Sequence, residues 1–193
     1  MKNTLFERQK AYQDLADFKL LKKLPVIIKL KGKNFTRLTK NLSKPFSVEF
    51  CKIMAESMEY VIKDIQGCVL GYTYSDQVTF VLMNDQTLDT EAWQDNKIQS
   101  ISTIVTSMFT NAFVKHQVAS DLDIIGDPIF AGIVFTTPNV TEAVNNLISQ
   151  QVVAYKDAVT FAVKDALLAK FGDQDKVNEL LNEIPTDGRK KLL

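Results

Sequence analysis

Four short runs of apolar, mostly β-branched residues constrain the fold of this chain more than any other feature of its sequence. They span residues 26–30, 68–74, 78–82 and 129–135. Runs of this length and composition are typical of strands. Only residues 75–77 separate the second run from the third, so these two runs are predicted to form a hairpin.

The two segments that connect these strands have the spacing of packed helices. After the first run, apolar residues recur at i, i+4, i+7 and i+8, with Pro45 in the predicted first turn and Gly67 as the stop. Before the fourth run, a second helix is predicted, with Asp89 or Thr90 as its cap. The order β-α-β-β-α-β is the ferredoxin-like pattern. The predicted fold class is therefore α/β (α+β), a palm with an antiparallel sheet and helices on one face.

Helices are also predicted toward both ends of the chain. Apolar residues at helical spacing predict one helix over residues 5–24. Asn139 with Glu142 resembles a capping box, which would open a helix over residues 139–170. A shorter helix is predicted over residues 176–183.

The length of 193 residues suits one domain with a sizeable core. We therefore predict a single domain over residues 1–193. Its palm core would span residues 24–136, and the extra C-terminal helices would lie within residues 139–193.

Charge is balanced over the whole chain but unevenly distributed. Lys and Arg together number 23, as do Asp and Glu. From Phe18 to Val48 there are nine basic residues and no acidic one. Such a block can meet phosphate groups electrostatically. It can equally be a solvated surface that acidic residues elsewhere in the fold balance.

The cysteines and the lengths of the apolar runs indicate where in the cell the chain is expected to lie. Cys51 and Cys68 have apolar neighbours, which predicts buried free thiols in a reducing, cytoplasmic setting. A zinc site is not expected, because His116 is the only histidine. No apolar run approaches about 20 residues, so no membrane partner is expected. The charged and polar start of the chain is not typical of a secretory signal.

Asp76, in the predicted hairpin, is the first candidate for chemistry. In a β-α-β-β-α-β palm, the end of the first strand lies beside the hairpin between the second and third strands. Carboxylates at both places can hold two Mg²⁺ ions that bridge a triphosphate. Here the end of the first strand carries Lys31, and the residue after Asp76 is Gln77. Asp76 is therefore the only carboxylate at these positions that supports such a site.

Several segments resemble the tRNA-histidine guanylyltransferase family. Residues 29–37 (KLKGKNFTR) and 71–81 (GYTYSDQVTFV) are similar to two motifs of that family, and Lys44-Pro45 lies between them at similar spacing. Residues 97–100 (KIQS) and 130–135 (FAGIVF) are similar to the start of its next helix and to a later strand. The resemblance covers roughly residues 24–171.

This resemblance implies addition of a guanine nucleotide to a tRNA 5′ end. It also implies GTP or ATP as ligand, Mg²⁺ as cofactor, tRNA or another RNA as partner, and a homo-oligomer, either a dimer or a tetramer. Asp76 matches a catalytic, metal-binding acid. The residues carried over to nucleotide binding are Lys31, Gly32, Lys33, Asn34, Phe35, Ser75, Lys44 and Lys97.

The departures from the family pattern fall on the residues that carry chemistry. Lys31 replaces the first metal-binding Asp, and Gln77 replaces a Glu. Ala131 and Ile133 replace an Asp and an Arg of the later strand, and only Gln150 survives from the motif in the following helix. These departures indicate a divergent or catalytically impaired member that binds a nucleoside triphosphate, RNA, or both.

Two alternatives stay open. The chain is an active nucleotidyltransferase if other acids supply the missing ligands, for instance Asp85, Asp123 or Asp127. It is a protein-interaction module if the palm only presents a surface. Lys31 also carries a sharper hypothesis, in which its ammonium group points toward Asp76 and supplies the positive charge of a metal. Otherwise Lys31 points to water.

Overall fold

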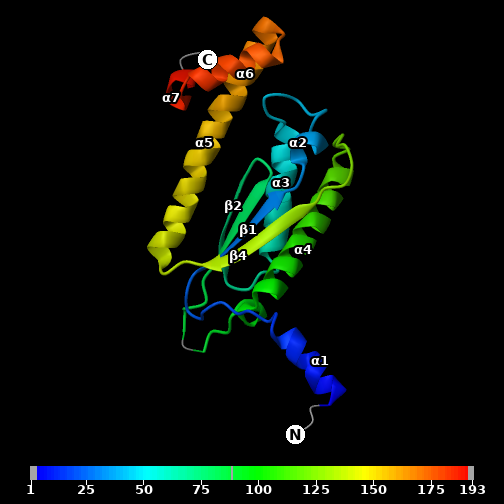
Figure 1. Cartoon of the computed structure of the whole chain (residues 1–193), viewed down its shortest axis with the longest axis vertical. Helices are drawn as coiled ribbons and strands as arrows, with labels where there is room; N and C mark the ends of the chain where they lie inside the picture. Colours follow the sequence, from blue (N-terminus) through cyan, green and yellow to red (C-terminus); the bar gives the residue numbers. More distant parts are fainter. Residues whose placement is uncertain (1–3, 88, 191–193) are drawn as a thin grey trace.

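A four-stranded antiparallel sheet forms the centre of the computed structural model, which describes residues 4–87 and 89–190 (Figure 1). The strands lie in the order β2-β3-β1-β4. The predicted strands and hairpin are thereby confirmed. Their bounds are Val26–Gly32 for β1, Cys68–Tyr74 for β2, Gln77–Leu82 for β3 and Phe130–Thr136 for β4.

Helices α3 (Val48–Ile62) and α4 (Ile98–Ala119) pack on one face of this sheet, as predicted. Alternation along β1 turns Ile28 and Leu30 toward these helices and into the main core. The neighbouring residue Ile27 points to the other face.

The second face of the sheet meets α5 (Val140–Phe171). Ile27 and Val81 form a small apolar cluster with Ala143 of this helix. Thr79 donates a hydrogen bond to Oε1 of Gln150 at 2.8 Å, and both residues are buried. The helices therefore cover both faces of the sheet and not one alone.

The start of α3 differs from the prediction. Pro45 lies before the helix, and the Ser47 hydroxyl caps it by accepting a hydrogen bond from the Phe50 N–H at 3.2 Å. The side-chain cap fixes the boundary more strongly than the proline does. Cys51 is exposed on the outer side of α3 and Cys68 is half-buried, so the prediction of two buried thiols is wrong for Cys51.

The start of α4 was also wrongly predicted. A 3-10 turn, η1 (Trp93–Asn96), precedes the helix, and Lys97 is the residue before its first turn. Asp89 and Thr90 lie upstream in a loop. There the Lys23 ammonium group donates to the Thr90 carbonyl at 3.2 Å, and this contact holds the loop without a helix.

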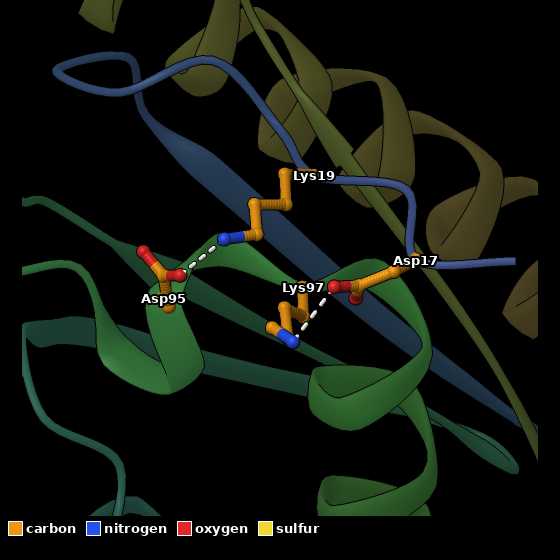
Figure 2. A network of polar contacts seen from close by, with 4 residues as sticks. All are labelled: Asp17, Lys19, Asp95 and Lys97. Atoms are coloured by element: carbon orange, nitrogen blue, oxygen red, sulfur yellow. Dashed lines mark hydrogen bonds and ion pairs between the residues drawn. The ribbon is translucent and has the colours of Figure 1, made fainter. Parts of the chain in front are cut away.

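The first helix is shorter than predicted. Helix α1 spans Leu5–Asp14, buries no residue and extends away from the sheet at the lower end of Figure 1. The following segment has no regular helix, and two ion pairs tie it to the start of α4 (Figure 2). Lys97 binds Asp17 at 2.7 Å, and Lys19 binds Asp95.

The C-terminal helices agree with the prediction. Asn139 caps α5 by accepting a hydrogen bond from the Glu142 N–H at 2.9 Å, and Gly172 ends the helix with a φ of 68°. Helix α6 (Gln174–Glu183) packs against the end of α5, and α7 (Thr186–Arg189) follows it. Within the described ranges, no helix is both long and apolar enough to cross a membrane.

Candidate nucleotide site at the hairpin end of the sheet

The end of β1 lies beside the β2–β3 hairpin, as the palm layout predicts. Lys31 is paired across the sheet with Gln77, and the Gly32 N–H donates to the Asp76 carbonyl at 2.8 Å. Ser75 makes the tight turn with a φ of 50°. The backbone therefore brings residues 31 and 32 together with residues 75–77.

Asp76 sits in an environment that disfavours its charge. Burial raises the pKa of its carboxyl group. Hydrogen bonds from its own backbone N–H and from Ser75, together with the positive charge of Lys31, oppose this effect without cancelling it. Lys31 is near enough to act on Asp76, but the described residues show no ion pair within 4.0 Å between them. The lysine does not fully neutralise the acid.

Lys29 and Lys31 lie on the same face of the sheet, because residues two apart on a strand point the same way. Lys29 is flanked by Thr79 on β3 and Ile133 on β4. Ile133 is 60% exposed, so the β4 side of this face is open. Sequence reasoning missed Lys29, although its spacing of two from Lys31 was a usable signal.

The turn after β1 has two exposed residues followed by one that is buried in the core. Lys33 and Asn34 are exposed, and Asn34 adopts a left-handed conformation with a φ of 59°. The Phe35 side chain, in contrast, is only 5% exposed and packs among other aromatic rings in the core. The Phe35 ring therefore serves the core, and contact between this residue and a nucleotide stays a prediction. An apolar residue at this position is needed to fill the core.

Lys97 lies away from the hairpin, and Lys44 makes a local contact. Lys44 donates to the Thr39 carbonyl at 3.3 Å in the loop that follows the short helix α2 (Phe35–Leu38). Lys97 lies where α4 begins, and the N–H of the next residue bonds to Phe18, ahead of β1. The end of β1 that Lys97 approaches is thus the end opposite to Asp76. Its charge is paired with Asp17.

The residues present do not fit a two-metal centre. In the part of the chain that the structure describes, no three His, Cys, Asp or Glu residues cluster as metal ligands would. Asp85 follows β3 at the end of the sheet away from Asp76. Asp123 accepts a hydrogen bond from Asn41 at 3.1 Å. Asp127 lies exposed in the loop before β4. Among the described residues, Asp76 therefore belongs to no group of three such ligands.

Two tyrosines border the site on β2. The rings of Tyr72 and Tyr74 lie 5.9 Å apart, centroid to centroid, on the same face of the sheet as Lys29 and Lys31. Burial raises the pKa of both phenols. Both side chains are half-buried, so neither belongs fully to the core nor stands free in solvent.

Comparison with solved structures finds the same architecture in guanylyltransferases. A bacterial tRNA(His) guanylyltransferase-like protein in complex with GTP has a TM-score of 0.79 and 28% identity, over 83% of this chain and 75% of that chain. One in complex with ATP has a TM-score of 0.87 and 24% identity, over 97% and 78%. The tRNA(His) guanylyltransferase of Saccharomyces cerevisiae has a TM-score of 0.82 and 19% identity, over 95% and 81%.

The sequence comparisons find a family model that matches this chain but no individual curated protein. No curated protein matches this chain significantly. The family model of tRNAHis guanylyltransferase matches residues 6–138, which is more than half of the chain. With the palm sheet, the hairpin that carries Asp76 and these structural matches, the chain belongs to the tRNA-histidine guanylyltransferase family.

Proposed function

We propose that this chain binds a nucleoside triphosphate, GTP or ATP, at the hairpin end of its sheet and that its metal-dependent nucleotidyl transfer is impaired. The family and the GTP- and ATP-bound relatives support nucleotide binding. The observation that carries the impairment is Lys31, which stands beside Asp76 where the family pattern has a metal-binding Asp. An ammonium group cannot bind Mg²⁺.

The RNA partner follows from the family. We propose a tRNA or another RNA end as the second ligand, which the nine basic residues between Phe18 and Val48 would help to attract. We also propose a cytoplasmic location and a homo-oligomer. Support for self-association comes from α5, where four apolar residues at a spacing of four are each about half exposed: Val140, Val144, Ile148 and Val152.

Thermal unfolding with GTP or ATP, with Mg²⁺ and with EDTA, tests the proposal. A ligand at about 100 times its Kd stabilises the folded state by about 2.7 kcal/mol. For a chain of this size that is a shift in Tm of roughly 5–10 °C. We expect a shift that persists in EDTA. A chain with no shift for either nucleotide does not bind them in the proposed way.

Incorporation of labelled GTP into RNA separates the impaired member from an active one. We expect no Mg²⁺-dependent incorporation above the level of a heat-inactivated sample. Efficient incorporation would mean that other acids complete the metal site after all. A chain that neither binds nucleotide or RNA nor incorporates GTP would be a protein-interaction module.

A further inference from the structure

Lys29 and Lys31 form a pair of cations on the face of the sheet that α3 and α4 do not cover. Their neighbours across the sheet are Thr79 and Gln77 on one side and Ile133 and Ala131 on the other. None of these four is acidic. Here two positive charges stand next to each other in a neutral row of side chains.

This pair has no carboxylate in direct contact, although Asp76 lies near enough to Lys31 for the two charges to interact. Among the described residues, no acid lies within 4.0 Å of either ammonium group. Burial lowers the pKa of Lys29, and the positive charge of Lys31 lowers it further. Lys31 is exposed and feels the charge of Asp76, so an incoming anion would chiefly offset the unfavourable charge of the half-buried Lys29.

The register of β1 and β4 places two departures from the family pattern next to each other. Lys31 and Ala131 are direct partners across the two strands, so their Cβ atoms lie about 5 Å apart. Both positions depart from the family pattern in the same direction, from Asp to a residue that is not acidic. Relative to the family pattern, the two changes together remove two acids from this corner of the sheet and add one positive charge.

We propose that Lys29 and Lys31 bind the phosphate chain of the ligand directly, without a divalent metal. The inference rests on the proposed function, because it concerns how the same site holds its nucleotide. In this arrangement Lys31 stands at the position where the family pattern has a metal-binding Asp, and Lys29 stands beside it on the same face of the sheet. The phosphate chain belongs either to a free nucleoside triphosphate or to an RNA that carries a 5′-triphosphate.

Equilibrium binding of inorganic tripolyphosphate to the full chain in EDTA tests this directly. We expect Lys29→Gln and Lys31→Gln each to weaken binding about tenfold and to reduce the salt dependence by about one ion. Lys63→Gln is the matched control, because it removes one charge from a 68% exposed lysine at the C-cap of α3 that pairs with Glu59. Its affinity should equal that of the parent.

Ala131→Asp provides a second test that leaves both lysines in place. A carboxylate directly opposite Lys31 would pair with its ammonium group, so we expect it to weaken tripolyphosphate binding about as much as Lys31→Gln does. Ala131→Asn controls for side-chain volume and should bind like the parent. Thermal unfolding of each variant confirms that the loss is not a loss of fold.

Three outcomes would overturn the proposal: no tripolyphosphate binding in EDTA, binding that appears only with Mg²⁺, or Lys31→Gln binding as tightly as Lys63→Gln. GTP binding that depends on Mg²⁺ and ignores both lysines would leave nucleotide binding intact while removing this inference. Tripolyphosphate binding without any nucleotide binding would keep this inference for an RNA 5′-triphosphate and remove the proposed binding of GTP or ATP. Competition by GTP and by short RNAs with a 5′-triphosphate or a 5′-hydroxyl identifies the source of the phosphate.

Discussion

Replacement of Gly32 by Ala should destabilise the fold through the ring of Phe35. A Cβ atom at position 32 would lie 2.3 Å from Cδ2, 2.6 Å from Cγ and 2.7 Å from Cε2 of that ring. The ring has no free space to retreat into, because Phe50, Phe113 and Phe130 surround it with centroids at 6.1, 5.9 and 4.9 Å. Either the backbone of β1 or this aromatic cluster must move.

Overpacking of this kind costs about 1–3 kcal/mol. For a chain of this size, that is a loss of roughly 2–12 °C in Tm. The measurement is thermal unfolding by circular dichroism without nucleotide, so that any effect on a ligand cannot contribute.

Gly71→Ala is the control for Gly32→Ala. Its Cβ atom would meet Sδ of Met58 at 2.9 Å, but this flexible side chain can move aside, so a smaller loss is expected. Adding Phe35→Leu to Gly32→Ala should cost less than the two single losses combined, because the collision is gone. If Gly32→Ala unfolds at the parent temperature, the argument that the ring requires glycine is refuted.

Three further predictions concern the sheet and its hairpin. Thr79→Val removes the donor to the buried Gln150 oxygen and should lower the free energy of unfolding by about 1–3 kcal/mol in denaturant titrations; the same loss in a Gln150→Leu background would contradict the assignment to this bond. Asp76→Asn should stabilise the fold at pH 7, because the pKa of Asp76 is raised above 3.8 in the folded state and ionisation therefore lowers stability as pH rises through that range. The advantage of Asp76→Asn should shrink as pH falls and vanish below about 3.8, as urea titrations across pH would measure; an equal gain at pH 3 would argue against a charge effect. Lys31→Asp should raise Mg²⁺ affinity by calorimetry, since it places a second carboxylate beside Asp76; affinity equal to the parent would mean that the corner lacks the geometry for a metal.

Periodicity predicted the sheet because local pattern and tertiary burial agree there. The β-branched run of β1 has alternate residues on two covered faces, and the hairpin needs only a two-residue turn. The start of α4 could not be predicted in the same way. Gln94, Asp95 and Asn96 all adopt left-handed conformations. Asp and Asn tolerate this conformation, but they also occur in ordinary turns and caps, so the sequence does not single it out.

The sequence predicted that the end of β1 lies beside the hairpin, but it did not predict where the side chains point. The motif placed Phe35 in the turn, but only packing against distant rings shows that it points into the core. Lys97 was selected for phosphate contact, yet its partner Asp17 lies 80 residues earlier in the chain and no local pattern joins them. Lys29 was overlooked because its importance depends on the cross-strand partners that register assigns.

The left-handed turn at residues 94–96 also has a consequence for local opening. Left-handed backbone costs on the order of 1–2 kcal/mol for a residue such as Gln94 and less for Asp95 and Asn96, so contacts from outside the turn help to hold it. These come from the segment before β1: Lys19 pairs with Asp95, and the Leu20 N–H bonds to the Asn96 carbonyl. The two segments therefore form one cooperative unit, whose amide hydrogens should exchange with solvent together and ahead of those in β1.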